Sequence, residues 1–268
     1  MVNNIKELFN RVKESKPLIH HITNTVTIND CANVTLAIGG SPVMATETNE
    51  MEEMIQLANA LVINFGTIHE QVFESMIRAG RAANRKGIPV IFDPVGVGAT
   101  SFRTSKSQIL LDQVKMDIIR GNVSELHALI GGSSQTKGVD AGEVSVSPIE
   151  IANRAAEKYK CSIGISGKED VISDGKRTFI LQNGDEILTK ITGTGCMSGS
   201  IIASFAAVSE DPLNATMVGM SVMSIAGQRA KQHLKLNEGL GTFKAKLIDE
   251  IDLMNAETFN LEVRIHEY

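Results

Sequence analysis

The spacing of apolar residues along the chain predicts several amphipathic helices. The clearest covers residues 69–85, where one face collects Val72, Phe73, Met76, Ile77, Gly80 and Ala83. Gly87 follows it as a stop signal. A helix near the N-terminus places Ile5, Leu8, Phe9 and Val12 on one face and ends before Pro17. Two more are expected, over residues 29–38 and after a cap at Asn49, with Glu52 completing a capping box.

Short, nearly all-apolar runs between these helices predict buried strands. They occupy residues 18–22, 41–45, 60–64, 88–92, 116–119 and 161–165. Residues 170–173 and 177–182 flank an Asp-Gly turn and predict a hairpin at the sheet edge. The chain from residue 193 on is nearly all helical in pattern, although residues 261–268 alternate like a strand without an assignable function.

The alternation of strands and helices indicates an α/β fold with a central, mostly parallel sheet flanked by helices on both faces. No internal repeat, low-complexity tract or linker-like change of composition interrupts the chain. We therefore expect residues 1–268 to form a single domain.

Composition and charge exclude several classes of protein. Hydrophobic residues make up 43% of the 268 positions and charged residues 21%, as is usual for a globular protein. A net charge of −5 without a basic run argues against nucleic acid as a partner. Three cysteines without Cys-x-x-Cys spacing predict neither a disulfide framework nor a zinc site, and Cys31 and Cys161 are expected in the core.

The chain shows no sign of membrane insertion or export. Its N-terminus has the pattern of an amphipathic helix and not that of a signal peptide. Residues 191–209 and 212–228 carry no charge, but they contain several Gly, Ser, Thr or Asn residues and are better explained as buried helices. We expect a cytoplasmic protein with no membrane partner.

Residues 190–205 carry the most unusual pattern, in which the glycine turn Gly193-Thr194-Gly195 leads into an apolar helix. Glycines let backbone N–H groups converge, and the first turn of a helix leaves its N–H groups unpaired and partly positive. Such a turn is a cradle for an anion. Cys196 lies at its mouth, where the same N–H groups would favour a thiolate. The alternative is a tight turn followed by a small buried cysteine.

Polar residues follow most of the predicted strands, and in an open α/β sheet ligands bind beyond the carboxyl ends of the strands. These residues are Asn24, Asn64 with Gly66 and Thr67, Asp93, Arg120 with Asn122 and Glu125, and Ser166. Carboxylates suit Mg²⁺ bound alongside substrate phosphates, and phosphoryl transfer needs little else from a protein. The P-loop motif and an early G-x-G-x-x-G are both absent, which argues against those nucleotide-binding folds.

Several of these pieces together resemble hydroxyethylthiazole kinase, a ribokinase-like family of thiamine salvage, from about residue 17 to residue 243. The matching pieces are HHITNTV at 20–26, GSPVMA at 40–45, DPVGVGA at 93–99, IRGN at 119–122 with Glu125, KGVD at 137–140 and TGTGC at 192–196. Cys196 discriminates most, because most ribokinase-like kinases have Asp where thiazole kinases have Cys. Thr194 departs from the wider group, which usually has Ala.

The resemblance implies transfer of the γ-phosphoryl group of ATP to the hydroxyl of 4-methyl-5-(2-hydroxyethyl)thiazole. It implies that Mg²⁺ is held by Asp93 and Glu125, and that ATP is contacted by Arg120, Asn122 and Ser166. The thiazole pocket is expected from Asn24, Met44, Gly66, Thr67 and Gly193. The catalytic residues are expected to be Gly193, Thr194, Gly195 and Cys196. The family forms trimers with active sites between subunits, so a homotrimer is expected.

Simpler interpretations exist for some of these residues. Met44 could be plain core, Glu125 an ordinary first-turn carboxylate, and one of His20 and His21 an inward-facing core residue. The chain as a whole could instead be a lyase of the same fold, of the ATP- or ADP-dependent NAD(P)H-hydrate dehydratase type. That family keeps Asp at the position of Cys196. It could also be a nucleotide-binding protein that has lost its chemistry.

Overall fold

A computed structural model describes residues 5–132 and 146–268. The KGVD piece at 137–140 lies outside these residues. Within them, nine strands form one sheet in the order β2-β1-β3-β4-β5-β6-β7-β8-β9. The strands are β1 (Leu18–Ile22), β2 (Ser41–Val43), β3 (Ala60–Asn64), β4 (Val90–Asp93), β5 (Ile118–Asn122), β6 (Ser162–Ser166), β7 (Asp170–Ser173), β8 (Thr178–Leu181) and β9 (Ile265–Glu267). Strands β1 to β6 pair in parallel, and β7 to β9 continue the sheet in antiparallel fashion.

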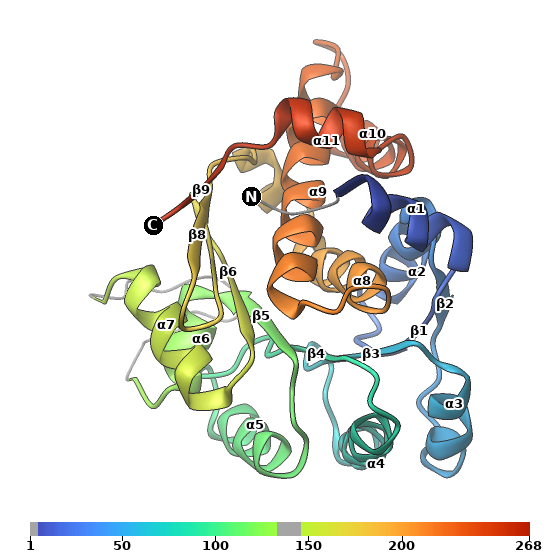
Figure 1. Cartoon of the computed structure of the whole chain (residues 1–268), viewed down its shortest axis with the longest axis vertical. Helices are drawn as coiled ribbons and strands as arrows, with labels where there is room; N and C mark the ends of the chain where they lie inside the picture. The colour runs from blue at the N-terminus through green and yellow to red at the C-terminus, as the bar shows by residue number, and fades with distance from the viewer. Residues whose placement is uncertain (1–4, 133–145) are drawn as a thin grey trace.

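Helices cover both faces of this sheet (Figure 1). One face carries α3 (Met51–Leu57), α4 (Glu70–Lys86), α5 (Ser101–Gln113), α6 (Val123–Leu129) and α7 (Pro148–Tyr159). The other face is covered by α8 (Thr194–Ala206) and α9 (Pro212–Gln232), with α1 (Ile5–Ser15), α2 (Ile28–Ile38), α10 (Leu240–Asp252) and α11 (Ala256–Glu262) packed around them.

Alternate residues of each strand enter two separate hydrophobic cores, because successive side chains point to opposite faces. Val62 and Ile91 lie in the core beneath α8 and α9. Their neighbours Leu61, Ile63 and Phe92 lie in the core beneath α4. The same alternation sets the direction of the polar residues at the strand ends. Asn64 lies two residues after Val62, and Asp93 two residues after Ile91, so both side chains point to the face that α8 and α9 cover.

The predicted α/β architecture with a mostly parallel, doubly covered sheet is confirmed. The predicted helix at 69–85 is α4, with Gly87 in the left-handed conformation at its C-cap. The alternating C-terminal segment provides β9, which pairs with β8. The hairpin of β7 and β8 therefore exists but is not the edge of the sheet, because β9 lies outside it.

The capping box predicted at Asn49 is wrong. Residues Thr48–Glu50 form a 3-10 helix whose N-cap is Glu47, and the Glu47 carboxylate accepts the backbone N–H of Asn49 at 3.2 Å. Helix α3 then continues directly from this turn without a side-chain cap. Glu52 pairs with Arg85 instead, at 3.0 Å on the surface. The Glu47 carboxylate thus caps the 3-10 turn by accepting from Asn49 itself, and Asn49 caps nothing at the start of α3.

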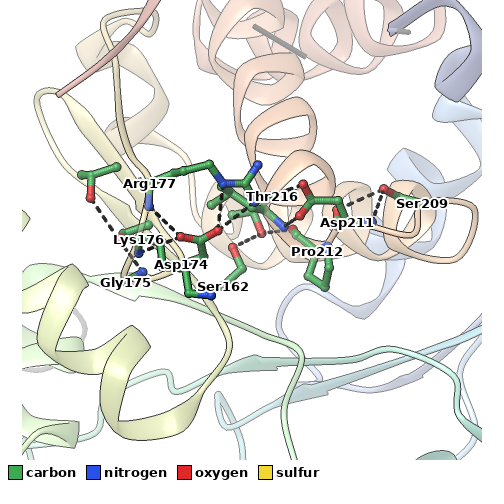
Figure 2. A network of polar contacts seen from close by, with 12 residues as sticks. Ser162, Asp174, Gly175, Lys176, Arg177, Ser209, Asp211, Pro212 and Thr216 are labelled. Atoms are coloured by element: carbon green, nitrogen blue, oxygen red, sulfur yellow. Dashed lines mark hydrogen bonds and ion pairs between the residues drawn. The ribbon is translucent and has the colours of Figure 1, made fainter. Parts of the chain in front are cut away.

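Polar contacts fasten the antiparallel strands to α9 at the amino end of β6 (Figure 2). Arg177, beside the β7–β8 turn, binds Asp174 at 2.8 Å and Asp211, the N-cap of α9, at 3.2 Å. Ser162 Oγ lies 2.9 Å from Thr216 Oγ1 of α9. Ser162 is the first residue of β6. This network therefore joins the sheet to α9 at the amino ends of the parallel strands, away from their carboxyl ends.

Candidate active site

Most of the predicted polar residues converge at the carboxyl ends of β1, β3, β4 and β5, facing the start of α8. Asn64 ends β3 and Asp93 ends β4, and the two are register partners in the sheet. Their side chains point to the α8 side, where the glycine turn introduces Cys196. Parallel strands of matched length thus bring together residues that lie far apart in sequence.

A chain of amides joins these groups. Asn24 Nδ2 donates to Asn64 Oδ1 at 2.9 Å, and Asn64 Nδ2 donates to Asp93 Oδ2 at 2.7 Å. Both Nδ2 atoms also lie 3.3 Å from Cys196 Sγ. Asn24, Asn64 and Asp93 are buried, with exposed fractions of 3%, 2% and 2%. The sulfur of the partly buried Cys196 therefore sits among buried polar groups that are held in place by one another.

The expected preference of Cys196 for the thiolate is not found. Burial, followed by the charge of Asp93, raises the pKa of the Cys196 thiol to about 12, against hydrogen bonds that lower it. A free thiol of ordinary pKa is already mostly protonated near neutrality. Cys196 is thus a neutral thiol in this protein, and Cys31 and Cys161 are buried as expected.

Asp93 and Glu125 form a pair of buried carboxyl groups. Burial raises the pKa of Asp93 to about 6, against the opposing charge of Arg120. Burial, followed by the charge of Asp93, raises the pKa of Glu125 to about 7. Two carboxylates that disfavour each other's charge in a buried site have the oxygen chemistry of a divalent cation site.

Glu125 also lies in the first turn of α6, as expected if it were only an ordinary helix-capping carboxylate. It forms a capping box with Asn122 at the start of α6, in which its Oε2 accepts the Asn122 N–H at 2.9 Å. Its Oε1 accepts the Gly96 N–H at 2.9 Å, from the loop after β4. Each oxygen keeps a free lone pair, so the capping role and a metal-binding role are compatible.

The fit to Mg²⁺ rests on these oxygens. Among the described residues, no three His, Cys, Asp or Glu side chains form a ready-made metal cage. A site with two carboxylates suits Mg²⁺, which usually keeps waters and takes substrate phosphates as its other ligands.

Arg120 lies against the glycine turn. A Cβ added to Gly195 would stand only 2.3 Å from Arg120 Nη1, so only glycine allows this approach. Within the described part of the chain, the buried Nε of Arg120 has no hydrogen-bond partner. The Arg120 guanidinium lies beside the N-terminus of α8, where its charge and the backbone N–H groups both favour an anion. The positive charge of Arg120 therefore lines one side of the predicted anion-binding turn.

The glycine turn itself requires glycine at two positions. Gly193 is the N-cap of α8 with φ 92°, and a Cβ there would meet Thr27 Cγ2 at 2.5 Å. The Thr194 side chain turns away from the site, because its Oγ1 donates to the Leu188 carbonyl at 3.2 Å. What Thr194 can offer at the cradle is its backbone N–H.

The remaining predicted residues lie around this centre. Gly66 packs against Asn24, since an added Cβ would be 2.5 Å from the Asn24 Cβ. Thr67 Oγ1 accepts the Thr25 N–H at 3.1 Å. Met44 directly follows β2 and is partly buried, so it is not plain core. Ser166 ends β6 beside its register partner Asn122, one strand farther from Cys196.

Sequence reasoning missed two residues of the site. Arg103 of α5 donates to the carbonyls of Phe65, Gly66 and Val95, and thus ties the loop after β3 to the loop after β4. Asp170 accepts the Gly167 N–H at 3.0 Å and the Ser224 hydroxyl at 3.2 Å. Burial raises the pKa of Asp170 to about 6, while the charge of Arg120 lowers it.

Only one of the two histidines of β1 was expected to face inward. Both are buried, because helices cover both faces of the sheet at β1. His21 Nε2 lies 3.0 Å from Ser200 Oγ and its Nδ1 lies 3.0 Å from the Ile19 carbonyl. Burial lowers the pKa of His21 to about 4, so the ring is neutral. His20 Nε2 lies 2.9 Å from the Ala45 carbonyl.

Comparison with known proteins identifies the family. The sequence pattern of the Hydroxyethylthiazole kinase family matches residues 9–257. The chain belongs to the hydroxyethylthiazole kinase family. A hydroxyethylthiazole kinase from Alkaliphilus oremlandii is 44% identical over 266 residues, covering 99% of this chain and 98% of the relative. The structure of a hydroxyethylthiazole kinase from Pyrococcus horikoshii OT3 has a TM-score of 0.88 and 37% identity, with 98% of both chains covered.

A more distant structure shows the wider fold. Pyridoxal kinase from Staphylococcus aureus superposes with a TM-score of 0.64 at 14% identity, over 94% of this chain and 98% of that one. The predicted ribokinase-like fold is thereby confirmed. Membership of the hydroxyethylthiazole kinase family supports the predicted kinase over the lyase alternative, with ATP and a small molecule as substrates. Among the described residues, no helix has both the length and the apolar character needed to cross a membrane.

Proposed function

We propose that this protein transfers the γ-phosphoryl group of ATP to the hydroxyl of 4-methyl-5-(2-hydroxyethyl)thiazole, giving the thiazole phosphate used for thiamine salvage. The observation that carries the proposal is the arrangement at the start of α8. There the glycine turn, Arg120 and two buried carboxyl groups surround Cys196. The names of the relatives in this family supply the acceptor.

The N–H groups of the first turn of α8 and the guanidinium of Arg120 are the proposed donors for phosphate oxygens. A preorganised donor of this kind contributes on the order of 3–4 kcal/mol to the transition state at comparable sites. Asn122 and Ser166, at the ends of β5 and β6, are proposed to extend the ATP site from this cradle. Asn24, Met44, Gly66, Thr67 and Gly193 are proposed to line the thiazole pocket.

Asp93 and Glu125 are proposed to hold Mg²⁺, directly or through water. When bound, Mg²⁺ would neutralise charge on the phosphates. The carboxyl pKa values of about 6 and about 7 support this assignment, because a site that disfavours two negative charges is stabilised by a divalent cation.

Cys196 is proposed to orient the acceptor hydroxyl as a neutral thiol. Its pKa of about 12 argues against its acting as a base near neutral pH. A loose phosphoryl-transfer transition state has little need of a base, because the bond to the leaving group is largely broken before the hydroxyl attacks. The alcohol proton can then be lost late in the reaction.

The decisive experiment incubates the protein with Mg-ATP and the thiazole alcohol and follows ADP and thiazole phosphate by mass spectrometry. Equal amounts of both products are expected. ADP release without thiazole phosphate would contradict the kinase proposal. NAD(P)H hydrate in place of the alcohol tests the lyase, whose product would be NAD(P)H.

We further propose that the protein is a homotrimer with its active sites between subunits. Val26, which follows the proposed pocket residue Asn24, is 64% exposed, and Leu36 on α2 is 57% exposed. In the proposed trimer, a neighbouring subunit would cover these apolar side chains. Light scattering after size-exclusion chromatography is expected to give three times the chain mass of 28.9 kDa.

We also propose a cytoplasmic location, since the three cysteines are unpaired and the co-substrate is ATP.

A further inference from the structure

The orientation of the two asparagine amides is fixed by donors that cannot be reversed. Asn24 Oδ1 accepts the backbone N–H groups of Val26 at 3.1 Å and Thr27 at 3.0 Å. Asn64 Oδ1 accepts the backbone N–H of Gly66 at 2.8 Å. A backbone N–H only donates, so the oxygen of each amide must face it. Both NH2 groups are consequently turned toward Cys196.

Asn64 uses its whole hydrogen-bonding capacity in this position. Its oxygen accepts from Gly66 and from Asn24, and its two amide hydrogens go to Asp93 Oδ2 at 2.7 Å and Cys196 Sγ at 3.3 Å. The side chain is 2% exposed, so water does not compete for these bonds. One buried side chain thus joins the loop after β3, a proposed metal ligand and the thiol.

We propose that Asn64 is a positioning residue for phosphoryl transfer, which holds the Cys196 sulfur as a hydrogen-bond acceptor. With two amide N–H groups directed at it, the sulfur presents its own S–H away from the asparagines. The direction of the S–H is therefore set by Asn64 and Asn24, and not by free rotation about the Cβ–Sγ bond. The role in catalysis rests on the proposed function, whereas the hydrogen bond to sulfur does not.

The substitution Asn64→Asp tests this with minimal change of shape. Aspartate keeps an oxygen for Gly66 and Asn24, and replaces the NH2 group that faces Asp93 and Cys196 with a carboxyl oxygen. The uncharged Asn64→Ser removes the same NH2 group without adding charge beside Asp93. The matched control is Asn84→Asp on α4, beside the segment that leads into β5 and far from Cys196. There the Asn84 amide also uses both its oxygen and its NH2 group, accepting the Lys115 N–H at 2.8 Å and donating to the Lys115 carbonyl at 2.9 Å. Circular dichroism verifies that each variant is folded at the assay temperature, and Asn64→Ser serves as a second variant.

Kinetics in a double-mutant cycle with Cys196→Ala separate positioning of the thiol from general damage. Asn64→Asp is expected to lower kcat roughly ten- to hundredfold, with KM for ATP changed less than about threefold. If the two substitutions acted independently, their fold-losses in kcat would multiply. Because both remove the same contact, kcat of the double variant is expected to be at least about fivefold higher than that product predicts. Losses that simply multiply would overturn the proposal, as would an unchanged kcat in folded Asn64→Asp.

The second readout does not require activity. The infrared S–H stretch of Cys196, isolated by subtracting the spectrum of Cys196→Ala, reports hydrogen bonding at the sulfur. It is expected to shift in Asn64→Asp and to stay in place in Asn84→Asp. A band that is unmoved in Asn64→Asp would refute the hydrogen bond. A wild-type protein that forms no thiazole phosphate would refute the proposed function instead, and the infrared comparison would still decide the contact.

Discussion

Replacing Glu125 with Gln is expected to change how the stability of the protein depends on pH. Burial and the charge of Asp93 raise the pKa of Glu125 from 4.5 to about 7. Between these values the folded protein holds a proton on Glu125 that the unfolded chain has released. The unfolded state therefore binds fewer protons, and the free energy of unfolding falls as pH rises. The difference between the two pKa values corresponds to on the order of 3 kcal/mol in the free energy of unfolding. Most of this stabilisation is lost between about pH 5 and pH 8.

The substitution has a second effect that does not depend on pH. In the wild type, one carboxylate oxygen accepts the Gly96 N–H and the other accepts the Asn122 N–H, each at 2.9 Å. The glutamine NH2 group can accept neither, so one buried backbone donor loses its partner at a cost of about 1–3 kcal/mol. Glu125→Gln should therefore be less stable than wild type at pH 5 and about equally stable at pH 8.

Urea unfolding in EDTA buffer at pH 5, 6, 7 and 8 measures both effects, with circular dichroism as the probe. Adding Mg²⁺ at pH 8 should stabilise the wild type more than Glu125→Gln, because ligand binding to the folded state adds to its stability. A difference between wild type and variant that is the same at every pH would refute the reasoning. An equal response to Mg²⁺ would remove Glu125 from the metal site.

Three further outcomes are expected at the glycine turn and its surroundings. Cys196→Ala should lower turnover while ATP binding, measured by calorimetry, is retained, and undiminished turnover would remove the thiol from catalysis. Gly195→Ala should lower kcat/KM for ATP at least tenfold, because its Cβ would stand 2.3 Å from the Arg120 guanidinium. Gly199→Ala in the same helix meets no atom within 4 Å and should stay near wild-type activity, so equal losses would contradict the steric argument. Arg103→Met should lower the free energy of unfolding by roughly 1–3 kcal/mol and raise KM for the thiazole alcohol, and an unchanged KM would show that the loops hold without it.

The strand ends of this fold could be located from the sequence because the physical signal is local. Apolar runs of about five residues followed by Asn64 or Asp93 predict a buried strand and a polar carboxyl end. The period of two then places both side chains on the same side of the sheet. Roles such as metal binding came from the family resemblance and not from the spacing, because a first-turn glutamate such as Glu125 is common without any function.

Other parts of the site depend on tertiary contacts that leave little trace in sequence. Helix α5 buries only Ser107 and Leu110 and shows no clear apolar face, so neither the helix nor its Arg103 was predicted. Asp170 opens a strand where the functional residues were expected to follow one. The thiol pKa of Cys196 is set by burial beside Asp93, which outweighs the helix terminus that the sequence shows.

The order in which the two faces of the sheet are covered has a consequence for biosynthesis. Strands β1 to β6 leave the ribosome before α8 and α9, so Val62, Ile91 and Ile118 lack these covering helices until the last third of the chain emerges. Chains fold from the N-terminus during synthesis, and exposed apolar surface on an incomplete sheet favours aggregation. Ribosome stalling after residue 190 should therefore yield a species that recruits chaperones, which full-length protein does not.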